Sequence, residues 1–219
     1  MSSAIRAVLF DLDGTLVDTH FLIHRCLDES LQHAAGLRFD EQWWQEGAGK
    51  PLHILFPIAL EKQGRTDISV DALIVDYRTR LRSYESEVRL FPGVSDMLNS
   101  IERLGLRMSI VTTKHSEAAV RHLASVGLTG RFETVMTGDK CDHYKPHPDP
   151  FNRVVNEMSL EPAHCVSIGD SPGDMHASRA AGIISVAAMW GCLDRTATID
   201  VGPDHVIESP GDLEALLIG

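Results

Sequence analysis

Apolar residues along the chain fall into short runs that alternate with amphipathic stretches. The runs predict β-strands at residues 5–10, 108–112, 134–137, 165–168 and 183–189, with a weaker candidate at 205–207. Apolar positions at helical spacing predict helices near residues 94–104, 116–126, 149–158, 174–181 and 212–217. Strands that alternate with helices in this way predict an α/β fold, in which helices cover a parallel sheet.

The stretch from residue 18 to residue 88 breaks this alternation, because its apolar residues recur only at helical spacing. Three such stripes occur, and they consist of Phe21, Leu22, Cys26, Leu27 and Leu31; of Leu52, Leu55, Phe56, Ala59 and Leu60; and of Leu73, Ile74, Tyr77 and Leu81. We therefore expect an all-helical domain at residues 18–88, inserted into an α/β domain of residues 1–17 and 89–219. The hinges are expected at 16–18 and 87–93.

Composition and charge narrow the classes of partner. The 219 residues include 43% hydrophobic and 23% charged residues, which is typical of a globular protein. A formal net charge of -11 argues against binding to nucleic acid or to anionic membranes, because both require a basic surface. The four cysteines show no zinc-like spacing, and no apolar run is long enough to span a membrane. We expect a cytoplasmic protein, either a monomer or a homodimer.

Polar side chains follow four of the predicted strands. Asp11 and Asp13 follow the first strand, Thr112 ends the second, Lys145 follows the third and Asp170 follows the fourth. Ligands of open parallel sheets bind at the carboxyl ends of the strands. Each residue alone has an ordinary structural explanation, and Ser171 with Asp174 forms a helix capping box. Together, the groups predict a ligand site, where the hydroxyl group of Thr112 can bind a phosphoryl oxygen.

The order of these motifs resembles the haloacid dehalogenase-like hydrolase superfamily. The matching segments are D-x-D-G-T at 11–15, the strand-end Thr112, the lysine of K-P-x-P at Lys145, and G-D-S-x-x-D at 169–174. The resemblance implies a Rossmann-like sheet with a helical cap, which corresponds to residues 18–88 here. The size of the cap and the segment Met189-Trp190-Gly191 favour the phosphoglycolate phosphatase-like subfamily.

This resemblance also implies a magnesium-dependent phosphatase that acts on a small phosphorylated metabolite. Asp11 would be the nucleophile that forms an aspartyl-phosphate, and Asp13 would be the general acid and then the general base. Thr112 and Lys145 would neutralise phosphoryl charge, and Lys145 is also expected to keep Asp11 ionised. Mg²⁺ would be held by Asp11, the backbone carbonyl of Asp13, and Asp170, with Asp174 as a direct or an auxiliary ligand.

Substrate contacts are expected from three places in the chain. The backbone after Asp11 and the second strand end would contribute Leu12, Gly14, Thr15 and Thr113. Lys50, on a loop of the inserted domain, is a candidate for a second anionic group of the substrate, although a solvated lysine on a loop is the simpler explanation.

Several alternatives stay open on the sequence alone. They are an inorganic pyrophosphatase, a phosphosugar mutase, a phosphonate hydrolase that uses Lys50 to form an imine, and a non-catalytic binding protein on the same fold. Dehalogenation is disfavoured because it does not need the proton-transfer group at Asp13. A transition-metal site at Cys141, His143 and His147 is disfavoured because a fourth ligand is missing.

Overall fold

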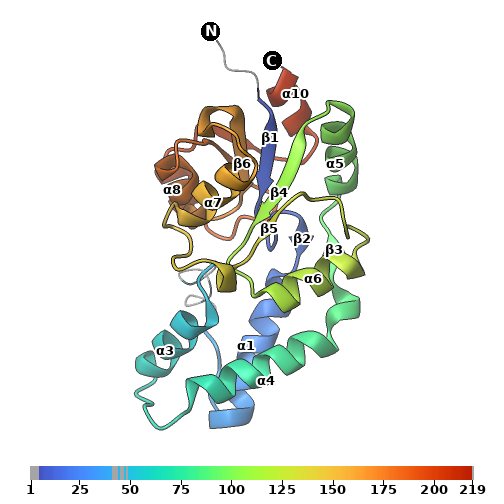
Figure 1. The fold of residues 1–219 in the computed structure, drawn as a ribbon. Coiled ribbons are helices and arrows are strands. Elements are labelled where there is room, and N and C mark those ends of the chain that lie inside the picture. The colour runs from blue at the N-terminus through green and yellow to red at the C-terminus, as the bar shows by residue number, and fades with distance from the viewer. Residues whose placement is uncertain (1–4, 41–43, 45–46, 48, 219) are drawn as a thin grey trace.

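The computed structural model describes residues 5–40, 44, 47 and 49–218, and its centre is a six-stranded parallel sheet (Figure 1). The order of the strands across the sheet is β5 (Val135–Met136), β4 (Arg107–Val111), β1 (Ala7–Phe10), β6 (Cys165–Gly169), β7 (Ile184–Ala188) and β8 (His205–Ile207). All six predicted strands are present within one to three residues of their expected bounds. The predicted α/β fold with a Rossmann-like sheet is confirmed.

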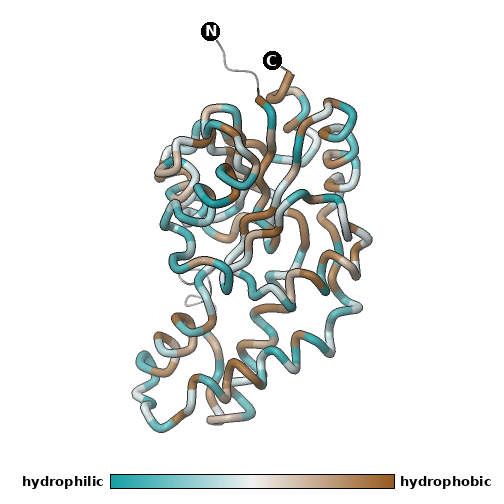
Figure 2. Tube along the Cα trace, in the orientation of Figure 1, coloured by the Kyte–Doolittle hydropathy of each residue, from teal (hydrophilic) through white to brown (hydrophobic). Residues whose placement is uncertain are grey.

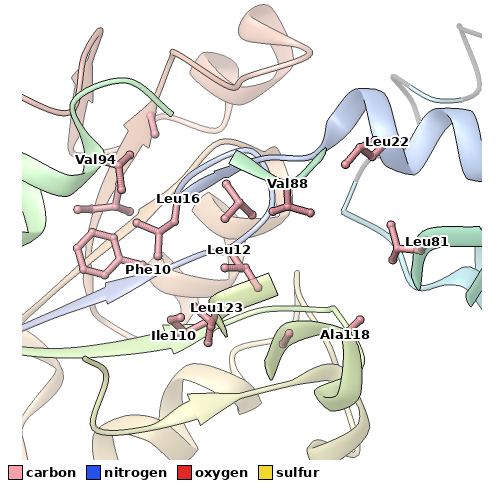
Figure 3. Packing of buried hydrophobic residues seen from close by; sticks show 14 of the residues in the cluster. Phe10, Leu12, Leu16, Leu22, Leu81, Val88, Val94, Ile110, Ala118 and Leu123 are labelled. Atoms are coloured by element: carbon pink, nitrogen blue, oxygen red, sulfur yellow. The ribbon is translucent and has the colours of Figure 1, made fainter. Parts of the chain in front are cut away.

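Helices cover both faces of the sheet. Successive residues of a strand point to opposite sides, so each strand contributes side chains to two hydrophobic clusters. Val8 and Phe10 of β1 pack in one cluster with α5 (Val94–Arg103), α6 (Ser116–Ser125) and α10 (Asp212–Ile218). Ala7 and Leu9 pack in a second cluster with α7 (Asp149–Glu157) and α8 (Pro172–Ala180). Figure 3 shows Leu12 and Leu16 pointing into the first cluster beside Phe10, Ile110 and Leu123.

Both expected hinges lie at a second, smaller sheet. It consists of β2 (Val17–Asp18) and β3 (Arg89–Leu90), which pair in antiparallel fashion. The described residues between these strands form α1 (His20–Ala35), α3 (Leu52–Lys62), α4 (Val70–Ser83) and a short 3-10 helix, η1 (Glu85–Glu87). In Figure 2, hydrophobic and hydrophilic positions alternate along α1, α3 and α4.

The predicted apolar stripes of these helices are correct except at Phe21. Leu22, Cys26, Leu27 and Leu31 are buried, but the side chain of Phe21 is 70% exposed. Consecutive residues of a helix are about 100° apart, so a stripe that begins at Leu22 leaves Phe21 beside the buried face rather than on it.

The pattern also missed one helix, α9 (Arg195–Asp200). It has six residues and includes two threonines and an isoleucine, which are weak helix formers. Its start has a recognisable signal, because the Asp194 side chain accepts a hydrogen bond from the amide of Ala197 at 2.9 Å. No helix in the described part of the chain is long and apolar enough to cross a membrane.

Candidate active site

The strand register brings the predicted groups to one edge of the sheet. Phe10 of β1 is level with Ile110 of β4 on one side and with Ile168 of β6 on the other. Asp11 therefore follows β1 between the ends of its two neighbours, and Thr112 and Asp170 extend from those neighbours at the same edge.

Lys145 connects Asp11 to the end of β4 and to the start of α8. Its Nζ lies 2.8 Å from Asp11 Oδ1, donates to the carbonyl oxygen of Val111 at 3.0 Å and donates to Asp174 Oδ1. The lysine is 7% exposed. Burial alone lowers the pKa of Lys145, but the carboxylates of Asp11 and Asp174 raise it above its ordinary value, so the ammonium group stays charged.

Lys145 favours the ionised form of Asp11, in the direction that the sequence predicts, but burial and two neighbouring carboxylates oppose it. Burial raises the pKa of the Asp11 carboxyl, Lys145 lowers it, and the nearby carboxylates of Asp174 and Asp170 raise it again, to about 8. Desolvation and the two neighbouring carboxylates together outweigh the effect of Lys145. A cation bound at this site would lower the pKa of Asp11.

Asp170 is held by two side chains from the segment after β1. The Thr15 hydroxyl donates to Asp170 Oδ1 at 2.8 Å, and His20 Nε2 lies 3.2 Å from Oδ2. Burial lowers the pKa of His20, but its hydrogen bond with Asp170 raises the pKa above the usual value. Gly14 turns the chain at φ +82°, and a Cβ there would lie 2.3 Å from both Asp170 Oδ2 and His20 Nε2. The D-x-D-G-T turn thus fits closely against the end of β6.

Asp174 begins α8 and forms the predicted capping box with Ser171. Its Oδ2 accepts hydrogen bonds from the Ser171 amide at 3.1 Å and from the Ser171 hydroxyl at 2.6 Å, while Oδ1 accepts from Lys145. Both oxygens of Asp174 therefore already have protein partners. The same side chain caps α8 and orients Lys145.

Asp13 has a different set of partners, none of which the sequence motifs had identified. Lys114 Nζ lies 2.8 and 2.9 Å from its two oxygens, and the Thr19 hydroxyl donates to Oδ1 at 2.5 Å. His122 Nδ1 is 4.0 Å from Oδ1. Burial raises the pKa of Asp13, but Lys114 and then His122 and Thr19 lower it to about 2. Lys114 stands in the same strand end as Thr112, which is the signal that could have identified it.

The carboxylate cluster fits a small divalent cation. Asp11, Asp170 and Asp174 each place one oxygen within 4.8 Å of the others, and among the described residues the ion-pair partners of these carboxylates are Lys145 and, when protonated, His20. An all-oxygen donor set with excess negative charge is what Mg²⁺ prefers. Among the residues that the structure describes, no comparable cluster includes Cys141, His143 or His147.

A cavity of about 280 Å³ opens above this cluster, between the sheet edge and α4. Its lining contains the predicted residues Asp11, Asp13, Thr112, Thr113, Asp170 and Lys50. The other predicted residues lie behind the lining, and these are Leu12, Gly14, Thr15, Lys145 and Asp174. Leu12 has a fully buried side chain, so only its backbone can face a ligand.

The segment Met189-Trp190-Gly191 supports the site from the other side. Trp190 Nε1 donates to the carbonyl oxygen of Thr15 at 2.9 Å. A Cβ at Gly191 would lie 1.9 Å from the carbonyl oxygen of Gly14, so only glycine fits there. These contacts fix the turn that carries Asp11 and Asp13.

The fold and this site define a class of protein. Residues 8–188 match the family model described as haloacid dehalogenase-like hydrolase, and the match covers most of the chain. The chain belongs to this hydrolase family, as its motifs predicted.

Similar proteins narrow the comparison further. Pyrophosphatase PpaX of Oceanobacillus iheyensis is 29% identical over 211 residues, which cover 96% of this chain and 95% of that protein. Pyrophosphatase PpaX of Bacillus pumilus is 30% identical over 217 residues, covering 98% and 97%. A crystal structure of a predicted phosphoglycolate phosphatase from Haemophilus somnus superimposes with a TM-score of 0.85 at 22% identity, covering 99% of each chain. The last likeness is one of fold.

Proposed function

We propose that this hydrolase is a magnesium-dependent phosphatase that cleaves a small phosphate ester or anhydride through an aspartyl-phosphate at Asp11. The observation that carries the proposal is the buried contact of 2.8 Å between Asp11 and Lys145, next to Asp170 and Asp174 at one end of the cavity. A carboxylate oxygen beside a fixed ammonium group, facing a cavity, is placed to attack a phosphoryl group rather than to stabilise the surface.

Asp11 would attack phosphorus, and the bond from phosphorus to the leaving oxygen would break. Lys145 and Thr112 would meet the equatorial phosphoryl oxygens, together with the amides that follow Asp11. Catalysis of phosphoryl transfer depends mainly on such positioning and charge neutralisation. Water would then attack the phosphorus of the aspartyl-phosphate, which releases phosphate and restores Asp11.

Mg²⁺ would be held by Asp11, the backbone carbonyl of Asp13 and Asp170. When bound, it supplies positive charge that keeps Asp11 ionised and neutralises phosphoryl oxygens. We assign Asp174 to the orientation of Lys145, which donates to its Oδ1 while Ser171 donates to its Oδ2, and we assign Asp170 to direct binding, as the resemblance to the family implies. Thr15 would orient Asp170 through its hydroxyl group.

Asp13 would exchange protons with the leaving oxygen and with the attacking water. With Lys114 on both of its oxygens, it is held as a carboxylate, which is the form that accepts a proton from water. To protonate a leaving oxygen, Asp13 must enter the step as the carboxylic acid, so it must first take up a proton from solvent and give up its contact with Lys114. Lys114 would then be free to neutralise charge on the leaving group.

Helices α1, α3 and α4 would form a cap domain of residues 18–88 over the core of residues 1–17 and 89–219. Support comes from the cavity, whose lining includes Ile74 and Tyr77 of α4 opposite Asp11 and Thr112. A cap that closes over this site would exclude bulk water from the reaction.

Inorganic pyrophosphate is a second candidate substrate beside phosphoglycolate-type monoesters. The relatives named pyrophosphatase support it, and so does Lys114, because the leaving group of pyrophosphate is an anion that a cation stabilises. We place the enzyme in the cytoplasm, consistent with its four free thiols, which all lie in the described part of the chain.

The test is phosphate release from a panel of pyrophosphate, 2-phosphoglycolate, hexose phosphates and nucleotides. Each is assayed with Mg²⁺ and with EDTA, for the wild type and for Asp11→Asn. The proposal expects release that needs the metal and disappears in the variant, whose thermal unfolding stays close to that of the wild type. Metal-independent release, or substantial turnover by Asp11→Asn, would rule out the proposed chemistry.

A further inference from the structure

Helix α4 turns one narrow face toward the cavity. Ile74, Tyr77, Arg78 and Leu81 line the cavity, and their spacing of three and four residues places them on one side of the helix. Three of the four are apolar or aromatic. Arg78 is therefore the one charged residue on this face, and it faces the same cavity as Asp11.

Arg78 differs from the two other arginines of its helix. Arg80 pairs with Asp76 and Glu29, and Arg82 pairs with Glu117. No ion pair or hydrogen bond joins the side chain of Arg78 to any residue in the described part of the chain. The chain contains 31 acidic and 20 basic residues, yet none of the described carboxylates pairs with Arg78.

The two other cations of the lining whose contacts are defined are already engaged. Lys114 holds Asp13, and Arg121 pairs with Glu85 and Glu117. Arg78 is solvent-accessible and keeps its hydrogen-bond donors available on the cavity wall. Its guanidinium group carries five donors in a planar fork, which matches the geometry of a carboxylate or a phosphate.

We propose that Arg78 binds a second anionic group of the substrate while the transferred phosphoryl group lies at Asp11. The substrate class is then a small molecule with a phosphoryl group at one end and a phosphate or a carboxylate at the other. The inference rests on the proposed function and deepens it. At about 280 Å³, the cavity is slightly below the range of about 300 to 1,000 Å³ typical of drug-sized ligands, which suits so small a molecule.

This assignment adds a specificity residue to the one that the sequence motifs indicated. Lys50 also lines the cavity, on the loop before α3. A lysine is a flexible point charge, whereas an arginine holds a planar anion through two parallel hydrogen bonds. Arg78 is therefore the better candidate for distinguishing substrates with a second anion from those without one.

The test compares Arg78→Ala and Arg78→Lys with the wild type on three substrates. Pyrophosphate carries a second phosphate, 2-phosphoglycolate carries a carboxylate, and 4-nitrophenyl phosphate carries no second anion. Arg38→Ala is the control for loss of one positive charge, because Arg38 follows α1, pairs with Asp28 at 3.0 Å, and has a side chain that is 78% exposed and outside the cavity lining.

For Arg78→Ala we expect kcat/KM to fall about 10- to 100-fold on at least one of the two-anion substrates, as for loss of a hydrogen bond to a charged group. The loss should be mainly in KM, and Arg78→Lys should recover part of it. On 4-nitrophenyl phosphate the change should stay within about threefold. The two-anion substrate with the larger loss identifies the group that Arg78 binds. Arg38→Ala should behave like the wild type on all three.

An equal loss on all three substrates, or no loss on any, would overturn the role of Arg78. Calorimetric binding of imidodiphosphate, which resembles pyrophosphate, and of methylphosphonate separates this role from catalysis. If Arg78→Ala weakens binding of imidodiphosphate but not of methylphosphonate, the inference holds even where the wild type releases no phosphate. If it weakens both equally or neither, the inference fails even where the proposed phosphatase activity is established.

Discussion

Asp11 and Asp13 lie on either side of Leu12, yet the pKa values of their carboxyl groups shift in opposite directions. Burial raises the pKa of Asp11, Lys145 lowers it, and the carboxylates of Asp174 and Asp170 raise it again, to about 8. Burial also raises the pKa of Asp13, but Lys114 contacts both of its oxygens and lowers the pKa to about 2. Each carboxylate thus has its own lysine, and the proposed nucleophile and the proposed acid/base group lie in separate electrostatic environments.

Replacement of Lys145 should destabilise the protein and also abolish activity. Lys145→Met leaves the carboxylates of Asp11 and Asp174 buried without their ammonium partner, and loss of one member of a buried ion pair costs about 3 kcal/mol of unfolding free energy. Lys140→Met is the matched control, because Lys140 is exposed and donates only to the carbonyl oxygen of Val135. Urea unfolding of both variants at neutral pH measures the difference. A similar small loss in both would contradict the buried network.

Gly14→Ala should damage the site more than the fold. The new Cβ would collide with Asp170 and His20, and residue 14 has φ +82°. Gly36→Ala is the control, because Gly36 has φ +66° but no atom within 4 Å of a new Cβ. We expect both variants to lose about 1 to 3 kcal/mol of stability through backbone strain. Only Gly14→Ala should also lose activity, by about 100-fold, because it displaces Asp170. Equal activity in the two variants would exclude a close fit between this turn and Asp170.

At the scale of elements, the site depends on where strands end and helices begin. The level register of β1, β4 and β6 brings Asp11, Thr112 and Asp170 to one edge. The start of α8 adds Asp174, whose capping contact with Ser171 also fixes the oxygen that meets Lys145. Local secondary structure and catalytic geometry therefore share the same side chains.

Ser171→Ala and Ser69→Ala remove comparable helix caps with different expected effects on activity. Ser171 caps α8, and Ser69 caps α4 by accepting a hydrogen bond from the Ala72 amide at 3.3 Å. Each change should cost about 1 kcal/mol of stability. Only Ser171→Ala loosens Asp174, so it should also lower kcat about 10-fold, as expected for a side chain that orients a site residue. The measurements are thermal unfolding and steady-state kinetics, and unchanged kcat in Ser171→Ala would contradict the shared role.

The carboxylate of Asp204, in the segment before β8, forms hydrogen bonds with Ser185 of β7, and these bonds favour its ionised form. Its Oδ2 accepts hydrogen bonds from the amide and the hydroxyl group of Ser185, at 2.8 and 2.6 Å. Burial raises the pKa of Asp204, but these hydrogen bonds lower it below the ordinary value. A lowered carboxyl pKa stabilises the folded state above the unfolded pKa of about 3.9, and the contribution is lost as the pH falls through the folded pKa.

The stability difference between the wild type and Asp204→Ala should therefore be largest at pH 7 and smaller at pH 3. Urea unfolding of both proteins at the two pH values tests this. A difference that is constant or grows toward pH 3 would show that Asp204 acts through packing and not through its ionised carboxylate.

Across the whole chain, the sequence predicts the strands, the helices and the groups at the strand ends. It does not predict which side chains contact one another in the site. The order of residues is enough to predict the alternation of strands and helices and the polar groups at the strand ends. The sequence pattern does not indicate that Lys114 and Thr19 contact Asp13, or that His20 contacts Asp170. The contacts of Lys114 and His20 join segments far apart in the chain. Those of Thr19 and His20 also depend on the direction in which α1 begins. The pattern wrongly predicts Phe21 as buried, because it lies next to the buried face of α1, and it misses α9, because six residues are too few to show a helical period.

Phosphorylation of Asp11 during turnover is the step on which the proposed mechanism depends, and acid quenching detects it. Wild type and Asp13→Asn are mixed with the best substrate and Mg²⁺, quenched during turnover, and mapped by peptide mass spectrometry. We predict one phosphoryl group on Asp11 that hydroxylamine removes, more of it in Asp13→Asn because the base for its hydrolysis is lost, and none in Asp11→Asn. Sustained turnover with no phosphorylated Asp11 in either protein, or with the phosphoryl group on another residue, would contradict the account.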